Sequence, residues 1–301
     1  MLPRWVRPRL GHLRAQYRPR PLTVPASYRR DCPPDPAPAV SLVTPSLNQG
    51  AFIGRAIDSV LAQGYPNLDY IVMDGGSTDE TIRVLESYGE RLRFESGPDG
   101  GPAAAIDHAL NAARGEIMGW LNADDLLLPG TLSYVARYFA QHPGVDMVYG
   151  HRFFIDERDR DIGAEVLPRH REVSLNWFGF VPQETAFWRR SLWDRAGGID
   201  ANLVVGYDWD LFVRFQGAGA KIVRLPRFLG CMRIHPAQRT RINDQIALVE
   251  QAAIRDRVHG RPVSLDEAKS RVDWYRLRSL AHHTWYRARR PFTRLAGAAD
   301  T

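Results

Sequence analysis

The stretch from Trp120 to Gly130 reads WLNADDLLLPG, and it places two adjacent acidic residues between two apolar runs. Burying a carboxylate costs free energy unless its charge is compensated. A divalent cation is a suitable partner, because Mg²⁺ and Mn²⁺ prefer carboxylate oxygens and often take only one or two of them from the protein. We therefore expect Asp124 and Asp125 to hold Mn²⁺ or Mg²⁺, with phosphate oxygens and water completing its coordination.

The residues before this stretch alternate between short apolar strands and amphipathic helices. Strands are predicted at 40–44, 70–73, about 91–95 and 117–121, and helices at 51–63, 78–88 and about 102–113. This alternation favours an α/β fold with a mostly parallel central sheet and helices on its faces. Ligands bind such sheets at the carboxyl ends of the strands. The loops that follow three of the strands should therefore gather in one cleft, and they read PSLNQG, DGGSTD and NADD.

Beyond Pro143 the pattern changes to a mixture of strands and helices. Strands and turns are predicted in VDMVYGHRFFIDE, QETAFWRR, KIVRLP and FLGCMRIH, and helices in SLWDRAGG, GYDWDLFVRFQGAG and at about 241–258 and 264–289. We divide the chain into a basic Pro/Arg-rich arm at 1–38, an α/β domain at 39–240 and a helical, basic and aromatic extension at 241–301.

Both ends of the chain carry basic residues interleaved with aromatic ones, and the net charge of the chain is +6. This charge suits nucleic acid, anionic lipid or phosphorylated substrates. The arm is interpreted either as a tail on the domain surface or as a segment that contacts an anionic membrane; nucleic acid is disfavoured because no recognised nucleic-acid module accompanies it. The C-terminal DWYRLRSLAHHTWYRARRPFTRL is interpreted either as a helix packed on the domain or as an interfacial helix.

Cysteine usage and hydropathy bear on the cellular location. Cys32 and Cys231 are the two cysteines, and their wide separation in the sequence argues against a metal cluster or a disulfide framework. No apolar run approaches the roughly 18 residues that a spanning helix requires, and the N-terminus lacks the apolar core of a secretory signal. We expect a cytoplasmic protein, with peripheral attachment to the inner face of the membrane left open.

The loop DGGSTD carries two acids with different expected roles. Asp74 follows the predicted strand 70–73, and the glycines after it allow the backbone to approach a flat ligand closely. A hydrogen bond from a nucleotide base or ribose to Asp74 is therefore predicted. Asp79 is expected to cap the next helix, which is a structural role.

Two further acids and one histidine are candidates for the site. Asp208 and Asp210 lie at the start of a predicted helix, where acids are favourable. Residues two apart on a helix point in different directions, so only one is expected to act as a general base, and Asp210 is expected to cap the helix or pair with Arg214. His235, at the end of a strand-like segment, is either an ordinary hydrogen-bonded histidine or a contact to metal or phosphate.

Taken in order, the segments PSLNQGAFIGRAIDSVLAQGYPNLDYIVMDGGSTDET, GEIMGWLNADDLLLPG, GYDWDLFVR and MRIHP resemble the glycosyltransferase family 2 proteins over about residues 39–240. The resemblance implies a GT-A fold, with a Rossmann-like nucleotide-binding half, an acceptor half and C-terminal helices here. It also implies an inverting, metal-dependent transfer of a sugar from a nucleotide-diphosphate sugar to a saccharide or lipid-linked acceptor, in the synthesis of cell-surface polysaccharide.

The same resemblance implies roles for particular residues. Asp208 matches the catalytic base, and Gln183 lies where acceptor contacts are usual. The metal ligands implied are Asp125 and Asp124, and we add His235 as a candidate. Contacts to the nucleotide sugar are implied for Pro45, Ser46, Leu47, Asn48, Asp74 and Asp124.

Three positions depart from the common family pattern. Leu47 stands where many members have Tyr, Gly75 where many have a second Asp that contacts the base, and Tyr207 where Glu is frequent. The identity of the nucleotide therefore stays open.

Other functions fit the sequence less well. A sugar-phosphate nucleotidylyltransferase would need a Gly-rich loop with Arg and Lys after the first strand, where this chain has PSLNQG. A non-catalytic sugar- or lipid-binding relative is disfavoured because Asp124, Asp125 and Asp208 are all present. A dehydrogenase is excluded because no G-x-G-x-x-G follows the first strand.

Overall fold

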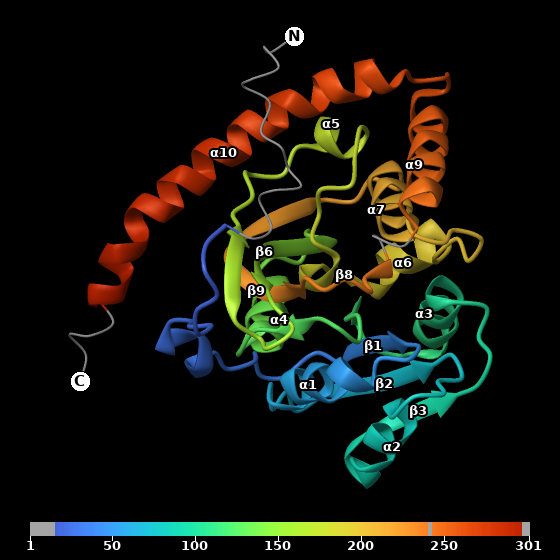
Figure 1. Ribbon diagram of the computed structural model, residues 1–301, viewed down its shortest axis with the longest axis vertical. Coiled ribbons are helices and arrows are strands. Elements are labelled where there is room, and N and C mark those ends of the chain that lie inside the picture. Colours follow the sequence, from blue (N-terminus) through green and yellow to red (C-terminus); the bar gives the residue numbers. More distant parts are fainter. Residues whose placement is uncertain (1–15, 240–242, 297–301) are drawn as a thin grey trace.

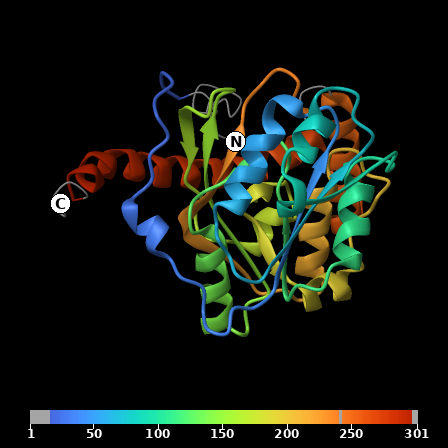
Figure 2. The same ribbon diagram turned by 90° about the horizontal axis from the view of Figure 1, so that it is seen from below.

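A single mixed sheet organises the computed structural model, which describes residues 16–239 and 243–296 (Figure 1). Its strand order is β3-β2-β1-β4-β8-β6-β9-β5, and β7 pairs with β6 outside this path. Two apolar clusters cover its two faces. One contains buried residues of α3, α6 and α7, and the other contains buried residues of α1 and α4. Figure 2 shows the ribbons of the helices around the sheet in a second view.

The first half of the sheet is parallel, as the alternation of strands and helices predicts. It consists of β1 (Val40–Ser46), β2 (Leu68–Asp74), β3 (Arg93–Ser96) and β4 (Ile117–Trp120), connected through α1 (Gly50–Leu61), α2 (Thr81–Glu86) and α3 (Pro102–Ala112).

The helix predicted at 78–88 is shorter in the structure. Asp79 accepts hydrogen bonds from the backbone N–H groups of Gly50 (3.0 Å) and Thr81 (2.9 Å), so the residues before Thr81 form a turn that ties α2 to the start of α1. The structural role expected for Asp79 is confirmed.

The second half of the sheet is mixed. It consists of β5 (Leu126–Leu127), β6 (Met147–Ile155), β7 (Asp161–Glu165), β8 (Phe187–Arg189) and β9 (Ile222–Arg233). The two strands predicted in KIVRLP and FLGCMRIH are one strand, β9, parallel to β6. Its register with β6 shifts between the pairs Tyr149–Arg224 and His151–Phe228. Pro226 lies in this irregular stretch, which is consistent with the absence of an N–H that proline could donate to a ladder. Pairing with β6 resumes beyond it, so the two predicted segments form one strand.

The helices of this half include two that the sequence did not predict, α4 (Thr131–Gln141) and α5 (Glu172–Leu175). The helices α6 (Arg190–Ala196) and α7 (Tyr207–Gly217) lie where they were predicted. α4 buries Leu132, Val135, Ala136 and Phe139 against the sheet, a spacing typical of an amphipathic helix.

The C-terminal extension forms α9 (Asp244–His259) and α10 (Leu265–Ala296). Figure 1 shows α9 beside α7 and α10 along the outside of the domain. The Tyr275 ring of α10 lies 5.0 Å from the ring of Phe178 and 4.7 Å from that of Phe180, centroid to centroid, so this part of α10 packs on the domain. The side chains of 285–296, which bear on the interfacial-helix interpretation, lie outside the described residues. Within the described part of the chain, none of the helices is both long and apolar enough to cross a membrane.

The described part of the N-terminal arm, residues 16–38, lies along the domain. Arg20 forms an antiparallel bridge with Asp161 at the start of β7, and Arg20 Nε lies 3.1 Å from Asp161 Oδ2. Residues 1–15, on which much of the membrane interpretation rests, lie outside the described residues.

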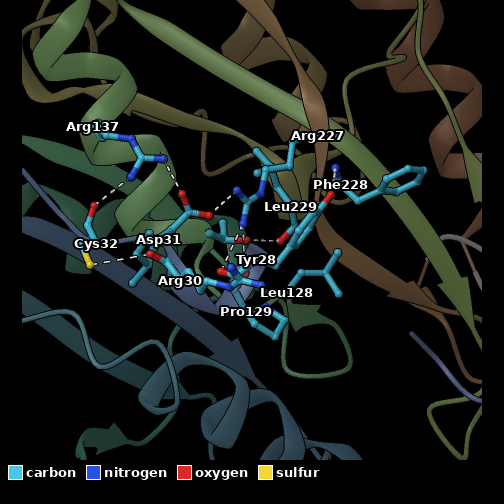
Figure 3. Close-up of polar contacts among 12 residues, drawn as sticks. Tyr28, Arg30, Asp31, Cys32, Leu128, Pro129, Arg137, Arg227, Phe228 and Leu229 are labelled. Atoms are coloured by element: carbon cyan, nitrogen blue, oxygen red, sulfur yellow. Dashed lines mark hydrogen bonds and ion pairs between the residues drawn. The ribbon is translucent and has the colours of Figure 1, made fainter. Parts of the chain in front are cut away.

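Farther along the arm, Asp31 joins it to two elements of the domain (Figure 3). Its carboxylate accepts hydrogen bonds from Arg137 of α4 and Arg227 of β9. The Arg227 guanidinium lies 3.8 Å from the ring centroid of Tyr28 and 4.4 Å from that of Tyr134, a cation–π geometry. The arm is therefore attached next to the turn that ends the acidic stretch.

A substitution at Gly130 would disturb this attachment directly. Its φ is +71°, and a Cβ there would lie 2.0 Å from the backbone oxygen of Tyr28. We predict that Gly130→Ala lowers the melting temperature by about 3–8 °C, since the left-handed conformation alone costs an alanine about 1–2 kcal/mol. Arg29 and Arg30 are already exposed in the arm, and trypsin should cleave after them faster in the variant, because the arm is held less firmly. Gly144→Ala, at a glycine with nothing within 4 Å of the added Cβ, is the matched control; equal behaviour of the two variants would contradict the prediction.

Candidate active site

A pocket of about 390 Å³ opens at the carboxyl ends of β1 and β4. Residues of β1 and the loop after it line one side, and the acidic loop 122–125 and the segment 204–207 before and at the start of α7 line others. Asp99, Met232, Gln238, Arg239 and Asn243 complete much of its wall. Of the three loops expected in one cleft, those after β1 and β4 meet here, whereas the loop after β2 does not line this pocket. The segment 204–207 joins them instead.

The acidic pair lies in this pocket with unequal exposure. Asp125 is buried; its Oδ1 accepts a hydrogen bond from the Arg233 backbone N–H (3.0 Å) and its Oδ2 one from Asn122 Nδ2 (3.3 Å). Asp124 is partly exposed, and its Oδ2 lies 3.0 Å from Nε2 of the buried His235. Burial, and then the negative charges of Asp124 and Glu184, raise the pKa of Asp125 well above its ordinary value. The pair therefore occupies a site at which a cation would be stabilised.

Arg233 contacts the acidic loop, but its guanidinium does not pair with the carboxylates of Asp124 and Asp125. Its Nε donates to the backbone oxygen of Asp124 (2.8 Å), and its NH1 group donates to the backbone oxygen of Asp156 (2.8 Å) and pairs with Asp159 Oδ1 (2.5 Å). The side chain of Arg233 therefore holds the main chain of the loop.

The donor set of the pocket suits a metal ion with few protein ligands. In residues 16–239 and 243–296 no group of three His, Cys, Asp or Glu side chains is arranged to hold a metal. Asp124 and His235 are in contact and Asp125 is adjacent, which matches a cation that takes one or two carboxylates and completes its shell with phosphate and water.

Asp74 lies beside this pocket and does not line it. Its Oδ2 accepts hydrogen bonds from the backbone N–H groups of Gly76 (3.1 Å) and Ser77 (2.9 Å) and from the Ser96 hydroxyl (2.8 Å), and its Oδ1 accepts one from the Ser77 hydroxyl. This buried carboxylate fixes the loops after β2 and β3. It borders a neighbouring hollow of about 420 Å³, and Asp99 lines both spaces.

One part of the loop after β1 lines the pocket, and another part contacts the loop after β2. Pro45, Ser46 and Leu47 line the pocket, and the Leu47 side chain is exposed there. Asn48 is turned toward the other loop, because its Oδ1 accepts a hydrogen bond from the Thr78 backbone N–H (2.8 Å) and its own N–H donates to the Ser77 hydroxyl (2.7 Å).

Asp208 lies in the first turn of α7, one residue beyond Tyr207 of the pocket wall. Its Oδ1 accepts a hydrogen bond from the Trp209 backbone N–H (2.7 Å). Burial raises the pKa of Asp208 to about 6, although Arg152 acts in the opposite direction. A carboxylate with this pKa is ionised at neutral pH and is basic enough to accept a proton from a hydroxyl in a transition state.

Asp210 has a structural role, as the sequence predicts. Its Oδ2 lies 2.7 Å from Arg214 Nε, and its Oδ1 pairs with Arg257 of α9. The carboxyl group is fully buried between these two arginines. The expected pairing with Arg214 is confirmed.

Gln183 and Glu184 lie on a short 3-10 helix beneath the acidic loop. Gln183 is buried, and its Nε2 donates to the backbone oxygen at the end of β4, on Trp120 (2.7 Å). Glu184 is buried 3.5 Å from Arg152 and acts electrostatically on both Asp125 and Asp208. The sequence prediction missed Glu184 and Asp99. Glu184 lies inside the apolar segment VPQETAFW, and an acid in such a segment indicates a buried carboxylate, as it does for Asp125.

Asp208 and Asp210 allow a paired test of stability within one helix. We predict that Asp208→Asn raises the melting temperature at pH 7.5 by about 2–4 °C, because it removes a carboxylate whose charge is disfavoured by burial. Because the pKa of Asp208 is higher in the folded state than in the unfolded state, this gain should shrink as the pH falls from about 6 to 4. Asp210→Asn should instead cost roughly 2–4 kcal/mol, because it leaves two arginines without a charged partner. The measurement is thermal and urea unfolding, and changes of equal sign in the two variants would contradict these assignments.

Comparison with known proteins identifies the family. The profile of glycosyl transferase family 2 matches residues 41–199. A PGL/p-HBAD biosynthesis glycosyltransferase of Mycobacterium tuberculosis is 31% identical over 193 residues, which cover 62% of this chain and 73% of that protein. An uncharacterized glycosyltransferase of Rickettsia typhi is 27% identical over 213 residues, 68% of this chain and 66% of that protein.

Solved structures share the fold. The mannosyltransferase PcManGT of Pyrobaculum calidifontis, solved with GDP-Man and Mn²⁺, superposes with a TM-score of 0.59 at 20% identity, covering 89% of this chain and 82% of that one. S. aureus TarS 1–349, solved with UDP-GlcNAc, superposes with a TM-score of 0.58 at 17% identity, covering 73% and 71%. The GT-A fold expected from the sequence is confirmed. The chain belongs to glycosyltransferase family 2.

Proposed function

We propose that this protein is a metal-dependent, inverting glycosyltransferase that moves a sugar from a nucleoside-diphosphate sugar to a hydroxyl group of a saccharide or lipid-linked acceptor. The observation that supports this most directly is the composition of one pocket. Its wall contains the acidic pair Asp124 and Asp125, and its other side is formed by 204–207, the segment that leads into Asp208.

The donor is proposed to bind between the loop after β1 and the acidic pair. Asp124 and Asp125, with His235 beside them, would hold Mn²⁺ or Mg²⁺, which when bound offsets negative charge on the diphosphate. The exposed Leu47 offers an apolar surface to the nucleotide, with Pro45 and Ser46 beside it. PcManGT and TarS, which share the fold, were solved with GDP-Man and UDP-GlcNAc, donors of this chemical class.

Other residues proposed to contact the donor act from the neighbouring loops. Asp74 would shape the base and ribose site by fixing two loops, and a direct contact would require it to exchange one of its present hydrogen bonds. Asn48 supports the same site through its contact with Thr78.

On the acceptor side, Asp208 is proposed to be the catalytic base. Its carboxylate takes the proton of the acceptor hydroxyl while the hydroxyl oxygen forms a bond to the anomeric carbon. The bond from that carbon to the diphosphate oxygen breaks in the same displacement, so the configuration inverts. Gln183 would support the acceptor side by holding the end of β4 at Trp120.

The proposed acceptor class is consistent with the surface next to the pocket. Asn243 of the pocket wall directly precedes α9, and the first half of this helix exposes Ile246, Leu248 and Val249. Such a surface would suit a lipid-linked acceptor at the inner face of a membrane, in the synthesis of cell-surface polysaccharide.

The two acids proposed to act on donor and acceptor should have separable effects. Asp208→Asn is expected to abolish sugar transfer and leave nucleotide binding within about threefold of the native protein, because Asp208 does not line the donor pocket. Asp125→Ala is expected to weaken the Mn²⁺-dependent binding of the nucleotide by about tenfold or more. Calorimetry with UDP and with GDP, each with Mn²⁺ and with EDTA, measures both effects and identifies the base. Similar binding defects in the two variants would refute this division of roles, and a fully active Asp208→Asn variant would refute the proposed base.

The pH dependence of turnover provides an independent test of Asp208. Because the base must be ionised and burial raises its pKa to about 6, kcat should fall about tenfold per pH unit below that value and level off above it. Nucleoside diphosphate release at saturating donor, measured from pH 4.5 to 8, would show this limb. A rate that stays constant from pH 5 to 7 would contradict the assignment.

A further inference from the structure

Glu250 of α9 makes an unusual contact with the segment before α7. Its Oε1 accepts a hydrogen bond from the backbone N–H of Val204 (2.6 Å), and its Oε2 accepts hydrogen bonds from those of Val205 (2.9 Å) and Gly206 (2.8 Å). One carboxylate thus binds three consecutive backbone amides. Hydrogen bonds to an ionised acceptor are stronger than neutral ones, and a negative charge at this end of α7 is favoured by the helix dipole.

The segment that Glu250 holds is part of the candidate active site. Val204 and Val205 line the pocket, and Gly206 is followed directly by Tyr207 of the pocket wall and by Asp208. A shift of this turn would therefore move both the wall of the pocket and the carboxylate that is proposed to act as base.

The packing around the turn leaves it little freedom while α9 is in place. A Cβ on Gly206 would lie 3.1 Å from Ile254 Cδ1 and 3.5 Å from Glu250 Oε2, both of α9. Arg257 of the same helix pairs with Asp210, which fixes the first turn of α7 from a second side. The helix that carries these groups lies beyond residues 41–199, the part of the chain that matches the family profile.

We propose that Glu250 is a positioning residue that completes the active site from the C-terminal extension, by holding the turn 204–206 and hence Asp208 in the geometry needed for transfer. The inference rests on the proposed function and extends it to α9. In this account the extension is a functional part of the enzyme. Loss of the carboxylate should release three amides and reduce turnover through misplacement of the base, for which displacements of about 1 Å can cost about 100-fold in rate.

The test compares Glu250→Ala and Glu250→Gln with Gln251→Ala in the full chain. Gln251 is the exposed neighbour of Glu250 on α9 and serves as the matched control. Nucleoside diphosphate release from UDP-GlcNAc and GDP-mannose with Mn²⁺ gives kcat and KM, and hydrogen exchange gives the protection of the amides at 204–206. We expect both Glu250 variants to lower kcat about tenfold to 100-fold with less than threefold change in KM, and to exchange faster at 204–206. Glu250→Gln should be the milder variant, because its amide oxygen can still accept from part of the turn, and Gln251→Ala should match the native protein.

The outcomes separate this inference from the proposed function. If the native chain releases nucleotide from neither donor and also fails to bind UDP or GDP in calorimetry, the proposed function fails. If the native chain is active and Glu250→Ala retains its kcat, or retains the exchange protection at 204–206, the role of Glu250 is refuted. A fall in kcat that only follows the fraction of folded protein, measured by thermal unfolding at the assay temperature, would likewise refute positioning, because a merely structural role predicts that result.

Discussion

Arg233 makes the contacts on which the geometry of the acidic loop depends. It is the last residue of β9 and is fully buried. Its backbone N–H binds Asp125, and its guanidinium binds the backbone oxygen of Asp124 and reaches the turn between β6 and β7 at Asp156 and Asp159. The loop after β4 is thus held by β9, a strand of the mixed half of the sheet. The positive charge of Arg233 is paired with Asp159, and its hydrogen bonds to the loop fix the acidic pair in position. Compensation of the two carboxylates is therefore assigned to the proposed cation.

The two sides of the pocket are held in different ways. Beside the proposed donor site, Asp74 and Asn48 connect the loops after β1, β2 and β3 through short-range hydrogen bonds. On the proposed acceptor side, Asp208 depends on the start of α7, and α9 holds that start through Glu250 and Arg257. Buried Glu184 lies within electrostatic reach of both sides, since its charge acts on Asp125 and on Asp208.

Local patterns in the sequence were sufficient for much of the parallel half. The strand–helix alternation located β1 to β4, and of the two roles expected for Asp210, a helix cap or a partner of Arg214, the pairing is found. α4 was missed although its apolar residues have helical spacing. The sequence indicates two strands, KIVRLP and FLGCMRIH, and only the pairing with β6 shows that they form one strand, β9.

Contacts between distant segments were the part that the sequence could not reveal. Glu250 and Gly206 are 44 residues apart, and no local pattern connects an acid in one helix to the amides that precede another. The sequence also could not reveal that hydrogen bonds from neighbouring residues occupy the carboxylate of Asp74. Glycines and serines after an acid are compatible both with ligand binding and with a closed turn.

The association of a cation with Asp124 and Asp125 can be tested directly by crystallography. Crystals soaked with Mn²⁺ and either UDP or GDP would be measured near the manganese absorption edge. We predict an anomalous peak next to the carboxylates of Asp124 and Asp125, in contact with the diphosphate and on the pocket side facing the segment 204–207. A bound nucleotide without manganese at the acidic pair, or manganese at a site away from both residues, would contradict the account.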